Sequence, residues 1–266
     1  LNTLIHELDL ASMIIPYSSV GAFDAPRIGR ARIYIHFKED KDTDGYYGML
    51  PEVIKDFDIN NLNKIGFSVL AAAAIMNLLK RQRDAVGLSI YSDNYDFYSN
   101  EKGSERHHQM LLAKLNEALA NKREQVETKT YTYLHEIADK IKRRSMVFLF
   151  TDMFQSDLEE EKLFEALQHL KYNKHEVILF HTYDKEKEIE FNFNNRPKQF
   201  VDVETGVHVN LYADTIRTNY EKAVKDYFKE LKIRCGQYRI KYVPVAVNED
   251  FSTILTTYLV EHQKFG

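Results

Sequence analysis

The sequence predicts an α/β fold of three αβα layers, in which helices cover both faces of a mostly parallel central β-sheet. Short apolar runs alternate with longer amphipathic segments from residue 31 to residue 247. The segments between these runs are long enough for the helical crossovers that parallel strands require. Near 189–211 the period changes to two, which predicts a small antiparallel excursion from the sheet.

The first half of the chain supplies the first strands and helices of this pattern. Apolar strands are predicted at 31–37, 86–91 and 146–150. Apolar residues at helical spacing predict helices at 64–83, 104–119 and 131–144. The first of these helices contains four consecutive alanines and no proline, which favours a buried position.

The second half continues the alternation and contains the antiparallel excursion. Helices are predicted at 157–171, 215–233 and 251–262, and core strands at 176–181 and 239–245. Period-two alternation predicts strands at 189–193, 198–203 and 207–211, the last two joined by a turn at 204–206. Residues 1–30 follow neither period, so we treat them as a separate N-terminal segment before one domain at 31–266.

Composition limits the classes of function. The chain of 266 residues is 44% hydrophobic and 29% charged, as in an ordinary globular protein, and its net charge of −4 argues against nucleic acid as the main partner. A single cysteine, Cys235, excludes an intramolecular disulfide and favours a reducing compartment. No apolar run reaches the roughly 18–20 residues that span a bilayer. We expect a cytoplasmic protein, and peripheral attachment to the inner membrane stays open.

Two predicted strands run directly into acidic residues. The strand at 31–37 is followed by Asp40, Asp42 and Asp44, and the strand at 146–150 by Thr151 and Asp152. Residues beyond the carboxyl ends of neighbouring parallel strands line the ligand crevice of such a sheet. Clustered carboxylates are costly unless a cation or a strong donor neutralises them. If the two strands are neighbours, these residues predict a cation site at that edge.

Several short motifs, in order along the chain, resemble one bacterial family. These motifs are Lys64–Ala74, Lys80–Leu88, Gly103–His108, His135–Ala138 and Phe150–Phe154. Together they resemble the domain-of-unknown-function-58 family, and among its members those of the Bacteroidetes. The resemblance implies a von Willebrand factor A-like fold and a non-catalytic accessory protein. Such proteins often work beside a MoxR-type AAA+ ATPase, which is the partner that the resemblance implies.

The resemblance also implies where a metal-ion-dependent adhesion site would lie. Such a site uses Asp-x-Ser-x-Ser after the first strand, a threonine from a later loop, and an aspartate after a following strand. Asp152 has the place of the last aspartate, and Thr128 and Thr130 are the candidates for the threonine. Asp40, Asp42 and Asp44 have the spacing of the first motif, with carboxylates where hydroxyls are usual. The cofactor expected there is Mg²⁺, or Ca²⁺ or Mn²⁺.

Other functions of the same residues stay open. The segment 40–44 also fits a solvated acidic turn, which would leave a degenerate, metal-free scaffold. A haloacid-dehalogenase-like phosphatase would use Asp40 as nucleophile and Asp42 as acid/base, but the chain has no Asp-Asp pair for its remaining motif. His107 and His108 are adjacent, so they point about 100° apart on a helix and do not chelate one ion. No glycine-rich phosphate loop is present.

Overall fold

The computed structural model describes residues 30–36, 63–91, 95–120, 130–141, 144–153, 157–192, 198–201, 208–211 and 213–249. Six of its strands form one sheet in the order β3-β2-β1-β4-β5-β8, and two form a separate hairpin, β6-β7. The sheet strands are β1 (Arg30–His36), β2 (Ala85–Tyr91), β3 (Tyr95–Tyr98), β4 (Met146–Thr151), β5 (Glu176–Tyr183) and β8 (Lys241–Ala246). The hairpin consists of β6 (Lys198–Val201) and β7 (His208–Leu211).

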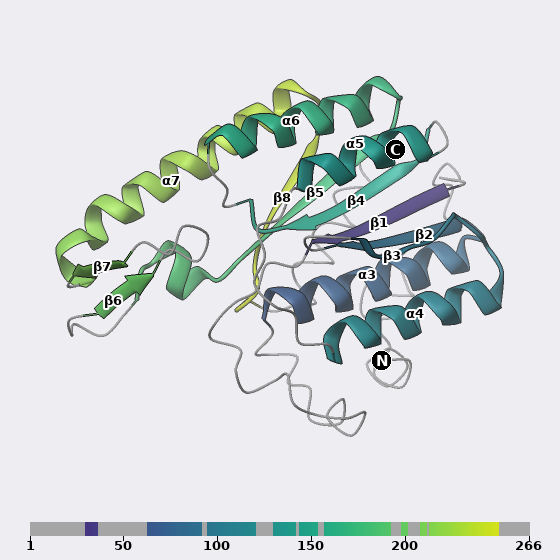
Figure 1. The fold of residues 1–266 in the computed structure, drawn as a ribbon, viewed down its shortest axis with the longest axis horizontal. Helices are drawn as coiled ribbons and strands as arrows, with labels where there is room; N and C mark the ends of the chain where they lie inside the picture. Colours follow the sequence, from purple (N-terminus) through teal and green to yellow (C-terminus); the bar gives the residue numbers. More distant parts are fainter. Residues whose placement is uncertain are drawn as a thin grey trace, which may run out of the picture.

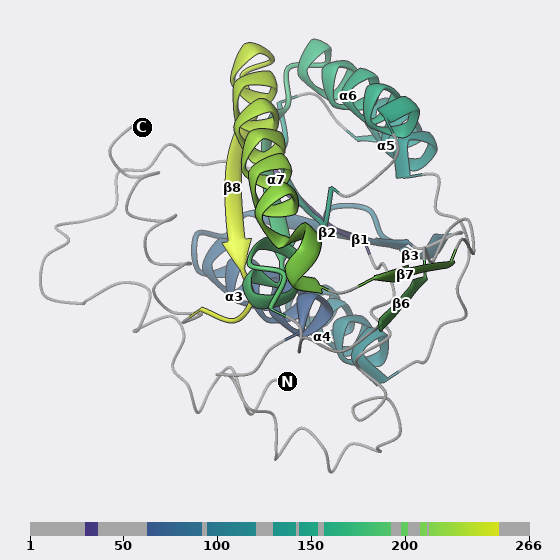
Figure 2. The same cartoon turned by 90° about the vertical axis from the view of Figure 1, so that its left-hand side faces the viewer.

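Helices cover both faces of the six-stranded sheet (Figure 1). On one face lie α3 (Lys64–Arg81) and α4 (Glu105–Ala120). On the other lie α5 (Thr130–Lys140), α6 (Asp157–Tyr172) and α7 (Ala213–Gln237), and the turned view agrees (Figure 2). The protein is therefore an α/β protein with a mostly parallel sheet, as the sequence predicts.

The order of the strands creates a switch point between β1 and β4. Strands β2, β1, β4, β5 and β8 pair in parallel, and only β3 pairs antiparallel, at the edge beside β2. From β1 the chain builds outward to β2 on one side, and from β4 it builds outward to β5 on the other. Ligands of open α/β sheets bind beyond the carboxyl ends of the strands at such a point.

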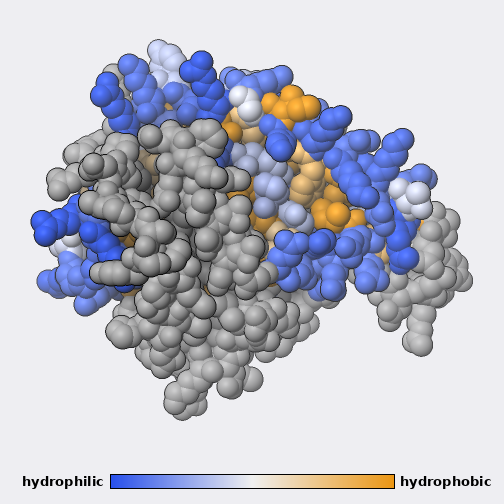
Figure 3. Space-filling view, turned by 180° about the vertical axis from the view of Figure 1, so that it is seen from behind, coloured by the Kyte–Doolittle hydropathy of each residue, from blue (hydrophilic) through white to orange (hydrophobic). Residues whose placement is uncertain are grey.

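Each face of the sheet has its own hydrophobic core. Under α3 and α4 the core includes Phe67, Leu70 and Phe150, all fully buried. Under the other helices it includes Leu149, Phe164 and Leu231. Strand residues therefore alternate between two buried faces, which explains why β4 is buried along its whole length. Seen from behind, hydrophilic side chains cover most of the helical surface, with hydrophobic ones showing between them (Figure 3).

Most predicted elements are confirmed within a few residues, and two differ. The strand β3 is not among the predicted elements, although three of its four residues are aromatic, as is typical of strands. The strand predicted at 189–193 is wrong, because Lys185–Ile189 forms a π-helical turn, η3. The Asp184 side chain caps this turn by accepting the Lys187 N–H at 3.0 Å. The antiparallel excursion consists of β6 and β7 alone, beside the start of α7 (Figure 1).

Some predictions fall on segments that the structure does not describe. The N-terminal segment up to residue 29 and the helix predicted at 251–262 are both outside the described residues. Among the helices that are described, none is both long and apolar enough to cross a membrane.

Candidate functional site at the carboxyl edge of the sheet

The two acidic-ended strands of the sequence are neighbours in the sheet. β1 and β4 pair in parallel, with Ile33 opposite Phe148 and Ile35 opposite Phe150. The chain therefore leaves both strands at the same edge, at the switch point. This confirms the condition on which the predicted site depends.

Asp152 lies just beyond β4 and is 5% exposed. The next residue, Met153, is fully buried and has a left-handed φ of 58°. A non-glycine residue holds this conformation only where its surroundings enforce it. Here the Tyr227 hydroxyl on α7 donates a hydrogen bond to the Met153 carbonyl. The turn that carries Asp152 is thus fixed by a helix from a distant part of the chain.

Lys64 contacts Asp152 from across the edge. It is the first residue of α3, where the partial positive charge of the helix N-terminus disfavours a cation. Its Nζ lies 3.9 Å from Asp152 Oδ2 and forms an ion pair with Glu188 Oε1. Only 13% of the Lys64 side chain is exposed. The two carboxylates explain why a lysine is stable at this end of a helix.

Glu188 comes from η3, which follows β5. Its Oε2 accepts the Asp184 N–H at 2.8 Å, and its carbonyl accepts the Tyr220 hydroxyl at 3.0 Å. Burial raises the pKa of the Glu188 carboxyl, and the Lys64 ammonium opposes that rise. Lys64, Asp152 and Glu188 therefore form one partly buried cluster of two carboxylates around an ammonium, the carboxyl-edge cluster.

His181 on β5 lies beside this cluster and is fully buried. Burial lowers the pKa of its imidazole to about 3, although the Asp152 charge acts in the opposite direction. Its Nδ1 lies 2.7 Å from the Tyr242 hydroxyl, and its ring packs 4.6 Å from that of Phe228. The imidazole is therefore neutral near pH 7 and adds no positive charge to the cluster.

The structure places only part of the predicted metal site. Asp152 is at the edge, as predicted, and Thr130 is the first residue of α5. Asp40, Asp42, Asp44 and Thr128 lie outside the described residues, so their share in the site stays a prediction. Over the described ranges, no group of three or more His, Cys, Asp or Glu side chains could hold a metal ion.

The described donors fit an internal ammonium better than a divalent ion. Asp152 and Glu188 supply hard oxygen atoms of the kind that Mg²⁺ and Ca²⁺ prefer. Lys64, however, contacts both carboxylates and already neutralises one of the two charges. A divalent ion on these two residues alone would have to lie against that ammonium.

Lys64 and Glu188 were not found from the sequence. Lys64 is 124 positions from Glu188, a separation that no local pattern reports. The one available signal was a lysine at the start of a helix, where its charge opposes the helix dipole. Glu188 falls next to the segment that was mistaken for a strand.

Other residues considered in the sequence have structural roles. The Ser104 hydroxyl accepts the His107 N–H at 3.4 Å, and His107 Nε2 lies 3.1 Å from the Val86 carbonyl oxygen, so His107 packs against the sheet. Cys235 is fully buried, and burial raises the pKa of its thiol to about 12. Neither residue is placed to react with a substrate.

Comparison with known proteins identifies the family. Among solved structures, the chain is similar to the "conserved hypothetical protein BatB from Bacteroides thetaiotaomicron", with a TM-score of 0.47 and 10% identity. That similarity covers 88% of this chain and 98% of the other. No curated protein matches the chain. The family model described as "Protein of unknown function DUF58" matches residues 52–230, more than half of the sequence, and the chain therefore belongs to the DUF58 family, as its motifs predict.

Proposed function

We propose that this chain is a non-catalytic protein-interaction domain with a von Willebrand A-like, three-layer arrangement, and that its carboxyl edge contacts the partner. The strand order with an antiparallel edge strand supports the arrangement, as do helices on both faces. The adjacency of β1 and β4 at the switch point carries the proposal, because it makes this edge the expected binding surface.

The carboxyl-edge cluster supports binding over catalysis. Lys64 is paired with both carboxylates, and His181 is neutral and fully buried. Among the described residues of the edge, no strong nucleophile therefore lies beside a free base, which is the arrangement that activates a serine, threonine or cysteine for covalent catalysis. The cluster fixes the ends of α3, β4 and η3 relative to one another and so presents a rigid surface.

The exposed rim of this edge is charged. Glu186 and Glu190 on and after η3 are exposed, and Lys185 pairs with Glu249 at 2.9 Å. Charged rims set the specificity and association rate of protein contacts more than their affinity. The partner that we propose is a cytoplasmic AAA+ ATPase of the MoxR type, as the family resemblance implies.

Charge reversal at the rim tests this proposal. The purified chain would be titrated against the MoxR-type ATPase of the same genome by biolayer interferometry, with Glu186→Lys/Glu190→Lys as the test variant. The control, Glu165→Lys/Glu230→Lys, makes the same change at exposed sites on α6 and α7. We expect about tenfold weaker binding for the rim variant alone. Unchanged binding of both variants would remove the carboxyl edge from the interface.

A metal-dependent form of the same function is the second candidate. The spacing of Asp40, Asp42 and Asp44 after the strand that neighbours β4 favours it. In this form Asp152, Thr128 or Thr130 and the 40–44 segment would hold Mg²⁺, Ca²⁺ or Mn²⁺, and a partner carboxylate would complete the coordination.

Calorimetric titration with each ion distinguishes the two forms. Binding by the wild type that is lost in a folded Asp152→Ala variant would establish the metal-dependent form. If the wild type bound none of the ions, the metal-free scaffold would be the form that is supported. Turnover of a generic phosphomonoester with Mg²⁺ would instead support the phosphatase that uses Asp40 and Asp42, and would contradict both binding forms.

A further inference from the structure

The amino edge of the sheet, opposite the carboxyl-edge cluster, carries an unusual set of turns. Four of the turns that lead from a helix into a strand place a basic residue in the left-handed region, at φ angles of 56–64°. These residues are Arg83 before β2, Arg144 before β4, Lys174 before β5 and Arg239 before β8. Glycine is the usual residue at this position, because a side chain is disfavoured there.

Local structure alone does not require these cations. At Lys174 and Arg239 the helix ends are closed by backbone hydrogen bonds, Lys174 N to Lys171 O and Arg239 N to Gly236 O. Glycine would make the same bonds without strain. All four side chains are exposed, and none forms an ion pair with another described residue. Strained positions of this kind cluster at binding sites.

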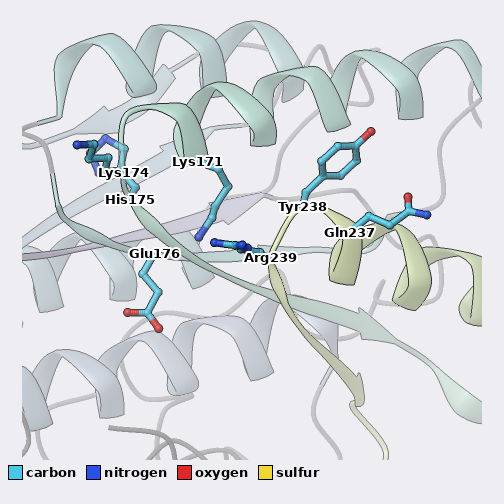
Figure 4. A pocket seen from close by; sticks show the side chains of 7 residues that line it. All are labelled: Lys171, Lys174, His175, Glu176, Gln237, Tyr238 and Arg239. Atoms are coloured by element: carbon cyan, nitrogen blue, oxygen red, sulfur yellow. The ribbon is translucent and has the colours of Figure 1, made fainter.

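Two of these turns border one pocket of about 440 Å³, which we call the amino-edge pocket (Figure 4). Lys171, Lys174, His175 and Glu176 line it from the end of α6 and the start of β5. Arg239, with its two preceding residues, lines it from the end of α7. In Figure 4 the cationic ends of Lys171 and Arg239 point toward one another, whereas Glu176 points away from them.

The charges of the amino-edge pocket do not balance. Burial lowers the pKa of the Lys171 ammonium, and the nearby Arg239 charge adds to this effect while Glu176 opposes it. The C-termini of α6 and α7 each contribute about half a negative charge. Three cations therefore face one carboxylate and roughly one further negative charge from the helices. The pocket keeps a net positive charge after its helix ends are counted.

His175 lines the pocket as a neutral side chain. Its Nδ1 accepts the Ser145 N–H at 3.2 Å, so the neutral ring carries its proton on Nε2. This buried N–H has no acceptor among the described residues. Burial lowers the pKa of the ring, which keeps it neutral at pH 7. This donor is closed off from solvent, so His175 brings no titrating charge to the pocket.

We propose that the amino-edge pocket binds the phosphate group of a phosphorylated ligand, held by Lys171, Lys174 and Arg239. A phosphate monoester carries about −1.5 to −2 charges at pH 7, and the net positive charge of roughly one in the pocket would neutralise part of it. The guanidinium of Arg239 has the fork that binds two phosphate oxygens, and the lysines add point charges. A pocket of this size accepts a small organic body beyond the phosphate. This site is separate from the carboxyl edge and does not depend on the function proposed there.

Calorimetry with inorganic phosphate at low ionic strength tests the site directly. We expect saturable, one-site binding that is weakened about tenfold in Lys171→Gln/Arg239→Gln. The control is Arg83→Gln/Arg144→Gln, which removes the same number of positive charges from the same edge of the sheet, outside the pocket. Unsaturable binding, or equal weakening in both double variants, would overturn the proposal and leave only general attraction to a basic edge.

Glycine variants separate the ligand site from the fold. Arg239→Gly relieves the strained turn, so its melting temperature should equal or exceed that of the wild type while phosphate binding falls. Arg144→Gly should show the same thermal effect with binding unchanged. Loss of binding together with a lower melting temperature in Arg239→Gly would assign a structural role to Arg239 and refute the ligand role.

A second arm identifies the source of the phosphate. The wild type would be mixed with phosphatidylcholine vesicles with and without phosphatidic acid, and sedimented. Sedimentation only with phosphatidic acid, reversed by inorganic phosphate and absent in Lys171→Gln/Arg239→Gln, would assign the pocket to a lipid headgroup. Phosphate binding in solution without sedimentation would assign it to a soluble phosphorylated molecule. Sedimentation that persists in the double variant would contradict the pocket as the lipid-binding element.

Discussion

Replacing Lys64 by methionine tests whether its ammonium stabilises the carboxyl edge. The substitution keeps an unbranched apolar side chain close to the length of the lysine stem but removes the positive charge between Asp152 and Glu188. Asp152 is only 6% exposed in its side chain and Glu188 is 25% exposed, so solvent screens the two carboxylates incompletely. Two carboxylates would then share a partly buried site without their cation.

The expected loss follows from two opposing effects. Removing one partner of a buried pair costs about 3–5 kcal/mol, because it leaves an uncompensated charge. Removing a cation from a helix N-terminus returns about 0.3–1 kcal/mol. We therefore expect Lys64→Met to lower the free energy of unfolding by about 2–4 kcal/mol at pH 7. Urea unfolding followed by circular dichroism measures this change.

The same helix supplies the control. Lys80 lies at the other end of α3 and pairs with Glu105 at 2.7 Å, with both side chains well exposed. Lys80→Met should change the stability far less, because solvent screens an exposed pair. Protonation should also reduce the Lys64→Met deficit, since burial already raises the pKa of Glu188 and its neutral form does not repel Asp152. The reasoning would be refuted if Lys64→Met lost no more free energy of unfolding than Lys80→Met. It would also be refuted if the loss measured below about pH 4.5 were as large as the loss at pH 7.

Three further predictions concern buried groups, the first two at the same edge and the third near the amino edge. The folded state keeps His181 neutral down to about pH 3, whereas the unfolded chain protonates it near 6.5, so stability should fall as the pH falls between these values. His181→Gln should flatten that part of a plot of the urea midpoint against pH. Tyr227→Phe leaves the carbonyl of the strained Met153 without this donor and should cost about 1–3 kcal/mol in urea unfolding. The Cys235 thiol, with a pKa of about 12, should react with a disulfide reagent only in denaturant, and rapid reaction of the native chain would contradict its burial.

The sequence pattern alone predicted the elements that are apolar along most of their length. The strand at Met146–Thr151 is apolar throughout because both faces of the sheet are covered, and its continuous apolar run reports this directly. The helix at Lys64–Arg81 is likewise buried on all sides from Gly66 to Met76, and its long apolar run without proline reports this. The alternation of strands and crossovers predicted a parallel sheet but left the adjacency of β1 and β4 as a condition, which the strand order meets.

Elements set by distant contacts could not be predicted. The residues Ile189 to Phe193 alternate as a strand does, yet the preceding residues form a helical turn. Asp184 and Glu188 accept backbone N–H groups at the start of this turn, and Glu188 is also paired with Lys64. The ring of Phe191 packs 4.5 Å from that of Tyr220 on α7. These contacts outweigh a weak local preference for a strand.

The lysine also constrains any metal at this edge. A divalent ion bound through Asp152 Oδ2 would lie roughly 2.0–2.6 Å from that oxygen, and the Lys64 ammonium is 3.9 Å from the same atom. The two cations would then be at most about 6.5 Å apart, with a repulsion of about 5 kcal/mol at an effective dielectric constant of about 20. Extra carboxylates such as Asp40, Asp42 and Asp44 would have to offset that repulsion. An ion held by Asp152 should therefore bind more tightly to Lys64→Met than to the wild type, and weaker binding would mean that Lys64 orients the metal ligands instead of competing with the ion.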